Sequence, residues 1–342
     1  MSVETPDLVS KPGGKPRERI MWRTAVIVMF AGLAVVGFVI SLAKGTVYIS
    51  VGDIVRILHS GMGIDVGSQV IWNIRLPRTL VGALVGINLA VAGAILQGVM
   101  KNPLADPHII GVSSGAGLAG IVILILFPGK EYLITPVAFI GAMGTALLIY
   151  VLAWRGGIQP VRIILAGVAV STFLGAGISG LMVFYSDRVH GALMWMIGGL
   201  SARSWPHLNI ILPYTVVGTL CAYLGAKRLN ILMLGDDVAR SLGIYVERTR
   251  LVLTAVAALL AASAVSVVGL LGFVGLIVPH AARLLVGSDY RFLLPASALL
   301  GAAVVTLSDT LARTIFSPIE LPVGIIMAFL GAPFFLYLLR RA

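Results

Sequence analysis

The sequence predicts an all-α integral membrane protein with about ten transmembrane helices. Three observations support this fold class. Hydrophobic residues make up 58% of the 342 residues, and the mean hydropathy is +1.02, well above the values of water-soluble domains. Only 11% of the residues are charged. The apolar residues form long continuous stretches, whereas the strands of a membrane β-barrel would alternate apolar and polar residues.

Eight stretches of the chain contain no Asp, Glu, Lys or Arg and are long enough to cross a bilayer. A transmembrane helix needs about 17 to 25 predominantly apolar residues. The stretches are residues 24–43, 79–100, 107–129, 132–154, 163–186, 208–226, 292–308 and 321–339. Each of them is predicted to form one transmembrane helix.

A ninth stretch, residues 251–282, is 32 residues long and could form one long helix or two helices. Five arginines follow it outside the apolar stretches: Arg283, Arg291, Arg313, Arg340 and Arg341. A single crossing would leave only Arg313 of these in the cytoplasm, whereas a break near residues 269–275 (GLLGFVG) would leave the other four there. The positive-inside rule favours the break. The resulting ten-span topology puts 17 of the 25 Lys and Arg residues inside and both termini in the cytoplasm.

The ends of the chain, its net charge and its cysteine content say little more about how the chain is organised. Residues 1–19 carry four basic residues before the first apolar stretch and are predicted to be a disordered cytoplasmic tail, so that 20–342 forms one transmembrane domain. The net charge of +11 comes from scattered single residues, which indicates membrane orientation and no nucleic-acid partner. Cys221 has no cysteine with which to form a disulfide.

Polar side chains inside the apolar stretches are few. Asn88 and Gln97 must either hydrogen-bond a neighbouring helix or face an aqueous path. Every Asp and Glu falls at or outside a predicted span boundary, and Asp309 comes closest to being inside one. Because Asp309 stands four residues before Arg313, the pattern predicts a local salt bridge at the outer membrane surface.

Residues 227–250 form the most highly charged cytoplasmic connection of the ten-span topology. Eight of these 24 residues are charged. Gly235 and Gly243 bracket a segment that predicts one or two helical turns, with Asp236 and Asp237 at the N-terminus, where acidic residues are favourable. The segment is either a solvated loop whose basic residues fix the topology or a docking surface for a cytoplasmic partner.

The chain lacks the motifs of an ATPase or a metalloenzyme. No GxxxxGK[ST] phosphate loop occurs, so the sequence predicts no ATP binding by this chain. Its five histidines are well apart in the sequence, with no HExxH pair and no Cys/His cluster, so no metal site is expected.

Several motifs distributed over the chain resemble the FecCD-type permeases, the transmembrane subunits of type II ABC importers for iron-siderophores, haem and vitamin B12. The match runs from about residue 20 to the C-terminus, and NPLADP and FVGLIVPH are its most specific parts. The motifs are RLPRTL (75–80), AGAILQGVMKNPLADPHIIGVSSGA (92–116), ILAGVA (164–169), WMIGGL (195–200), LGDDVARSLG (234–243), GFVGLIVPHAARLLVGSDYR (272–291), DTLAR (309–313) and ELPVGIIMAFLGAPFFLYLL (320–339). The resemblance implies a BtuC-like ABC importer permease fold over residues 20–342.

The resemblance assigns a partner to the charged connection. In this family the loop between the sixth and seventh spans forms short coupling helices that sit in a cleft of a separate ATPase subunit. The positions that match here are Leu234, Gly235, Asp236, Asp237, Ala239, Arg240, Ser241, Leu242 and Gly243. Mixed charges suit this role because they specify the register of a soluble partner, which a bare apolar loop would not.

The resemblance also suggests residues on the outer face and along the substrate path. Arginines of the family receive glutamates of a substrate-binding protein, and Arg75, Arg78 and Arg313 match them. The cytoplasmic gate of the family matches two short segments. Span five and the segment after it would line the path at the symmetric interface, and a membrane-interface anchor is the alternative role for the methionines and the tryptophan of that segment. The gate and path residues are Asn102, Leu104, Gln159, Pro160, Val161, Met194, Trp195 and Met196.

These resemblances predict the permease subunit of an ABC importer in a bacterial or archaeal cytoplasmic membrane. The chain would form a homodimer with two ATPase subunits, which hold ATP and Mg, and with one periplasmic or lipid-anchored substrate-binding protein. It would bind no cofactor and catalyse no covalent chemistry. An iron-siderophore complex is the expected metal-chelate substrate, and haem and cobalamin are alternatives. A secondary transporter that works without ATP is the alternative of a different class.

Overall fold

The computed structural model describes residues 16–45, 47–154 and 159–341 and contains only helices in these ranges. Ten helices have 13 residues or more: α1 (Pro16–Ala43), α4 (Leu76–Val99), α5 (Val112–Leu126), α6 (Ile134–Ala153), α7 (Pro160–Phe184), α9 (Trp205–Met233), α11 (Val246–Val268), α12 (Val274–Val286), α13 (Tyr290–Thr314) and α14 (Val323–Arg341). Four short α-helices lie between them: α2 (Val51–Ser60), α3 (Val66–Val70), α8 (Val189–Ile197) and α10 (Asp236–Ser241). Brief turns of π- or 3₁₀-helix are η1 (Ile71–Arg75), η2 (Pro107–Ile110), η3 (Glu131–Leu133) and η4 (Ser186–Arg188).

The ten longer helices agree with the ten predicted spans. Seven are long and apolar enough to cross a membrane, and α5, α12 and α14 are shorter apolar helices. The predicted break in residues 251–282 is confirmed, because α11 ends at Val268 and α12 begins at Val274. Gly269 and Phe273 both have positive φ, which ends one helix and redirects the chain before the next.

The start of α1 differs from the prediction. The expected disordered tail covered residues 1–19, but α1 begins at Pro16, so residues 16–19 belong to a helix. Proline suits the first turn of a helix because its missing N–H has no intrahelical acceptor there. Residues 1–15 lie outside the described residues.

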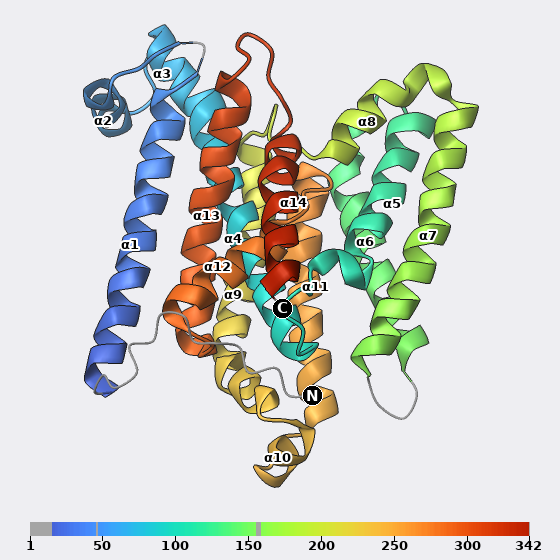
Figure 1. The fold of residues 1–342 in the computed structure, drawn as a ribbon. Coiled ribbons are helices and arrows are strands. Elements are labelled where there is room, and N and C mark those ends of the chain that lie inside the picture. Colours follow the sequence, from blue (N-terminus) through green and yellow to red (C-terminus); the bar gives the residue numbers. More distant parts are fainter. Residues whose placement is uncertain (1–15, 46, 155–158, 342) are drawn as a thin grey trace.

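The helices form a buried centre surrounded by a lipid-facing periphery. Helix α4 is the most enclosed span, with 78% of its apolar window buried, and it packs against α13, α11, α9 and α12. Helix α7 is the least enclosed, at 17%, and it packs against α5 and α6 at the edge of the molecule (Figure 1). A helix with so little of its surface covered must face lipid or another chain.

The centre is close-packed because glycines lie where the central helices cross. A Cβ added to Gly86 of α4 would lie 2.1 Å from the carbonyl oxygen of Gly301 in α13. One added to Gly93 would lie 1.9 Å from the oxygen of Gly275 in α12. Small residues let backbones approach in this way inside lipid, where the hydrophobic effect does not hold helices together.

The two polar residues of the second predicted span bind neighbouring helices. The amide of Asn88 donates to Ser263 Oγ of α11 at 3.0 Å. Gln97 Nε2 donates to the carbonyl oxygens of Gly275 and Leu276, and its Oε1 accepts from Arg283 Nη2 at 2.9 Å. The sequence left open whether these side chains bind a helix or face water, and the structure shows that they hold α4 to α11 and α12.

The two ends of the molecule differ in structure. Helix α10 projects at one end, where α1 begins and where α12 turns into α13 (Figure 1). Helices α2 and α3 lie at the opposite end, together with the connection from α13 to α14. Since the ten-span topology places residues 227–250 in the cytoplasm, the α10 end is the cytoplasmic end, and α14 runs toward it.

Candidate functional site

The short helix α10 forms the tip of the cytoplasmic end. Gly235, with φ of +112°, separates it from α9, and Gly243, with φ of +79°, turns the chain toward α11. Both conformations favour glycine because a Cβ would clash with the backbone. The predicted helical turn between these two glycines is confirmed.

Asp236 attaches α10 to the rest of the molecule. Its Oδ1 accepts hydrogen bonds from Lys101 Nζ at 2.7 Å and from Arg250 Nη2 at 2.8 Å. Partial burial acts to raise the pKa of Asp236, but the hydrogen bond from Lys101 and the charge of Arg250 outweigh it and hold the pKa below its ordinary value. Lys101 follows α4 and is 135 residues away in the chain, so no local pattern indicated this pairing.

Asp237 and Arg240 lie on the outer face of α10. The side chain of Asp237 is fully exposed, and Arg240 is more than half exposed. The Arg240 guanidinium lies 3.5 Å from Asp237 and 4.0 Å from Glu247. Both residues are therefore accessible to a partner, whereas Ala239 is buried and packs α10 onto the protein.

Large apolar side chains are also exposed around α10. They are Leu234, Val238, Leu242 and Tyr245. Val238 and Leu242 stand four residues apart, which places them on one side of the short helix. Sequence reasoning included Leu234 and Leu242 as family positions but missed Val238 and Tyr245. Both side chains are exposed although their segment does not cross the membrane, and only the structure shows this exposure.

The predicted gate segments lie in two separate connections. Asn102 Oδ1 accepts a hydrogen bond from the backbone N–H of Leu104 at 2.9 Å, which closes a tight turn directly after Lys101. Gln159 is the N-cap of α7, Pro160 is the first residue of that helix, and Val161 is exposed. No hydrogen bond joins the two segments in the part of the chain that the structure describes.

Helix α8 contains three of the predicted path residues, and one of them, Trp195, does not fit that role. Trp195 is buried, and its ring lies so close to α5 that a Cβ on Gly120 would approach it to 2.7 Å. Met196 is partly buried and packs against a cluster that contains Ile121 and Ile178. Met194 is the exposed member of the three. The tryptophan belongs to the core of its own chain, because the missing side chain of Gly120 leaves a space that the indole fills.

Arg78 forms the centre of a buried ion-pair cluster toward the outer end. Its Nε and Nη2 donate to the two carboxylate oxygens of Asp309, each at 2.9 Å, and its Nη1 donates to Glu320 at 2.8 Å. Arg78 and Asp309 are buried, so this is a bidentate pair in a largely apolar environment. The cluster joins α4, α13 and the connection to α14.

Arg75 and Arg313 hold the end of α1. Arg75 Nη1 donates to the carbonyl oxygens of Leu42 and Ala43, at 2.6 and 3.1 Å, and its Nη2 donates to that of Val47. Arg313 donates to the backbone oxygen and the hydroxyl of Ser41. Both guanidinium groups thus satisfy carbonyl oxygens that have no partner inside the helix.

The exposure expected of Arg75, Arg78 and Arg313 is therefore corrected. All three side chains are buried and engaged by groups of this chain. The expected local pair of Asp309 with Arg313 is also secondary, since that N–O separation is 3.9 Å against 2.9 Å to Arg78. Helix α13 continues to Thr314, so Asp309 lies inside the span and needs a desolvated partner. The role of the arginines in docking a binding protein stays a prediction.

In the described residues, ten apolar helices surround a glycine-rich centre and a charged helix forms the cytoplasmic tip, which defines a multi-pass membrane protein. The model of the FecCD transport family matches residues 33–341, and the chain belongs to that family. It is the membrane transport subunit of an ABC importer and not an enzyme, because ATP hydrolysis in such systems belongs to a separate subunit.

Individual relatives agree with this assignment over most of the chain. The chain is 40% identical over 316 residues to the Fe(3+)-citrate import system permease protein YfmE of Bacillus subtilis (strain 168), covering 92% of this chain and 94% of the relative. It is 44% identical over 278 residues to the cobalamin import system permease protein BtuC of Halobacterium salinarum, covering 81% and 74%. A solved inward-facing conformation of a putative metal-chelate type ABC transporter has a TM-score of 0.83 at 31% identity, covering 93% of this chain and 100% of that one.

Proposed function

We propose that this chain is the permease of an ATP-driven importer for a ferric chelate of the siderophore type. It works as a homodimer with two ATPase subunits, which hold ATP and Mg, and with one substrate-binding protein. The observation that carries the proposal is the α10 surface, defined as Leu234, Asp237, Val238, Arg240, Leu242 and Tyr245. This surface is exposed at the cytoplasmic tip, beyond the membrane-spanning helices.

The α10 surface has the composition of a protein interface. Four large apolar side chains would face water in the isolated chain, and such exposure outside the membrane marks a contact with another protein. Asp237 and Arg240 border these side chains and supply charges of both signs. The apolar residues provide buried area on docking, and the charges fix the orientation of the ATPase subunit.

Asp236 connects this surface to the gate and to the centre of the fold. Its two ion pairs reach Lys101, which directly precedes the Asn102–Leu104 turn, and Arg250 in the first turns of α11. When ATP closes the ATPase pair, a displacement of α10 is transmitted through these contacts to the gate turn and to α11. The change between outward-open and inward-open states then follows as a movement of packed helices.

The homodimer is supported by the exposed face of α7 and α8. Helix α7 presents large apolar residues over its whole length, and Met194 extends the same kind of surface along α8. The exposed apolar residues of α7 are Val161, Leu165, Val168, Phe173, Val183 and Phe184. A second copy of the chain packed across this face about a two-fold axis would use the same surface on both protomers. The path would then lie between the two copies.

The ferric chelate is supported by the relative named for Fe(3+)-citrate, which matches over 92% of this chain. Cobalamin is the second candidate, because the haloarchaeal relative named for it is 44% identical to this chain over 81% of its length. Both are metal chelates. A path between two protomers therefore suits either substrate. Selection between the ferric chelate and cobalamin belongs to the substrate-binding protein and to the residues that line the path.

The docking role is tested by placing acidic residues on the α10 surface. The double variant Val238→Asp, Leu242→Asp should bind its ATPase subunit at least about 100-fold more weakly, because each change removes an apolar contact and introduces an unpaired charge at the interface. Affinity is measured with the permease in nanodiscs. Asp236→Asn, on the inner side of α10, should retain ATPase binding, as should Ile64→Asp, which is fully exposed between α2 and α3 at the other end. Normal ATPase affinity of the double variant would contradict the docking role.

A further inference from the structure

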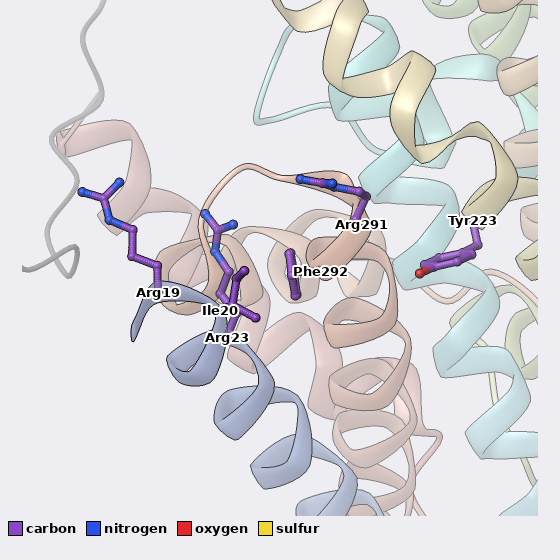
Figure 2. Close-up of a pocket in the computed structure, with 6 residues that line it drawn as sticks. All are labelled: Arg19, Ile20, Arg23, Tyr223, Arg291 and Phe292. Carbon is purple, nitrogen blue, oxygen red and sulfur yellow. The ribbon is translucent and has the colours of Figure 1, made fainter. Parts of the chain in front are cut away.

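A second charged feature lies at the cytoplasmic end, on the side away from the path. Three helices that are distant in sequence surround a cavity of about 430 Å³ there. It is lined by Arg19, Ile20 and Arg23 from the start of α1, Arg291 and Phe292 from the start of α13, and Tyr223 from α9. Figure 2 shows Arg291 extending toward Arg23, with Phe292 between them, while Arg19 extends outward from the start of α1.

The cavity carries an excess of positive charge. Asp289 does not line the cavity, but its carboxylate binds the lining residue Arg291 at 2.6 Å and lies 3.7 Å from Arg23. The hydrogen bond from Arg291 holds the pKa of Asp289 at about 2, so the acid stays ionised. Arg19 forms no ion pair with any residue that the structure describes. Three arginines line the cavity, and no acid is among its lining residues in the part of the chain that the structure describes.

The position of the cavity is the boundary between apolar helix and water. The charge-free part of α1 begins directly after Arg23, and that of α13 begins directly after Arg291. Trp22 lies in the same turn of α1, is half exposed, and donates its indole N–H to the Leu285 carbonyl oxygen at 3.0 Å. Tryptophan in this arrangement marks the level of the lipid headgroups. Only 28% of the apolar window of α1 is buried, so most of the surface of this helix is left for lipid.

The side chains are held in place before any ligand binds. The guanidinium of Arg23 stacks over the Phe292 ring at 5.1 Å, and Asp289 receives a further hydrogen bond from Asn230 at 2.7 Å. Arg23 and Asp289 therefore form a fixed support, beside which Arg291 is 55% exposed and Arg19 is also exposed. A planar guanidinium binds phosphate oxygens through paired N–H groups, and Ile20 and Phe292 provide apolar contact for the carbon skeleton beside the phosphate.

We propose that this cavity binds the phosphate of an anionic phospholipid in the cytoplasmic leaflet. The ligand chemistry is a phosphate that carries a net negative charge and is joined to an apolar chain. Basic pockets between membrane helices on the cytoplasmic side suit such lipids because each arginine near the surface adds electrostatic attraction. The bound lipid adds a link between α1, α9 and α13, which already meet at this level through the Asp289 contacts and the Arg23–Phe292 stack.

The test measures lipid binding by native mass spectrometry of the delipidated chain, titrated with phosphatidylglycerol or phosphatidylcholine. The variant Arg19→Gln, Arg291→Gln keeps Arg23 and its support and should bind phosphatidylglycerol about 25-fold more weakly, since each arginine contributes a factor of about five. The parent should bind phosphatidylcholine weakly. The control Arg228→Gln, Arg248→Gln removes two exposed arginines that do not line the cavity and should match the parent.

Two further measurements keep the result unambiguous. Arg19→Gln alone removes a side chain without a described partner, cannot disturb the fold through a lost contact, and should weaken phosphatidylglycerol binding about five-fold. Inorganic phosphate at millimolar concentration should leave phosphatidylglycerol bound. Unchanged lipid affinity of the double and single variants, or an equal loss in the control, would overturn the proposal. Displacement of the lipid by inorganic phosphate would overturn it in favour of a soluble anion.

Discussion

The variant Asp309→Asn should lose about 3 to 5 kcal/mol of stability, because it leaves buried arginine without its counter-charge. Asp309 accepts both hydrogen bonds of a bidentate pair with Arg78, and both side chains are almost fully buried. Asparagine has the same shape, so the loss comes from charge and not from packing. The guanidinium groups of Arg78 and Arg313 would then share only Glu320, which is more exposed.

The stability of this cluster is measured by thermal unfolding of the purified chain in detergent. Arg56→Ala is the matched control, since the Arg56–Asp53 pair lies at the same end but is exposed, and its loss should cost less than about 1 kcal/mol. The double variant Arg78→Met, Asp309→Asn should cost less than the sum of the two single changes, because each single change strands one buried charge. An Asp309→Asn protein that unfolds at the parent temperature would contradict the structural role of the pair.

The variant Gly93→Ala should prevent the chain from folding into its native arrangement. The added methyl group would lie 1.9 Å from the backbone oxygen of Gly275, so α4 and α12 would have to separate by roughly 1 Å or more to reach an ordinary carbon–oxygen contact. Neither atom belongs to a side chain that could rotate away. Since α4 is the central helix, its displacement would affect the packing of α11 and α13 as well.

The yield of monodisperse protein after detergent extraction measures this effect. Gly144→Ala in α6 is the matched control, because a Cβ there meets nothing within 4 Å. That change should leave the yield unchanged or raise it, since alanine favours a helix over glycine by up to about 1 kcal/mol. A parental yield for Gly93→Ala would mean that the two backbones are not in contact in the membrane.

Most of the helix arrangement could be predicted from the sequence because the bilayer imposes it. Charged residues are expensive in hydrocarbon, so their positions mark the ends of nine apolar stretches, and the positive-inside rule decided that residues 251–282 cross twice. The α10 turn was also predictable, because Gly235 and Gly243 bracket two aspartates. Both features depend on local sequence or on a one-dimensional count of charges.

The same reasoning failed where charge pairs form across the fold. A rule that ends a span at the first charged residue ended one at residue 308 and placed Asp309 outside it, although α13 continues to Thr314. Its partner Arg78 is 231 residues away, and no local pattern connects them. For the same reason Arg75 and Arg313 were expected to be exposed, whereas backbone carbonyl oxygens at the end of α1 occupy them. The burial of Arg75 and Arg313 cannot be recognised without the tertiary structure, because their hydrogen-bond partners are distant in the chain.

The contacts between α10 and the rest of the molecule were equally impossible to predict from the sequence. Asp236 and Asp237 are adjacent and have the same chemistry, yet the first binds Lys101 and Arg250 while the second faces solvent. Only the rotation of α10 about its axis distinguishes them, and that rotation is set by the burial of Ala239. Replacing both aspartates together would therefore combine loss of docking with loss of an internal contact.

Uptake into proteoliposomes tests the central claim most directly. The vesicles contain this chain with its ATPase subunits, and the substrate-binding protein is added outside with a radioactive ferric chelate or with cobalamin. We expect accumulation of the ferric chelate that requires ATP inside the vesicles, requires both partners, and is lost in the Val238→Asp, Leu242→Asp variant. Accumulation driven by a proton or sodium gradient in vesicles that contain this chain alone would contradict the account, and ATP-dependent accumulation of cobalamin alone would replace the ferric chelate as the substrate.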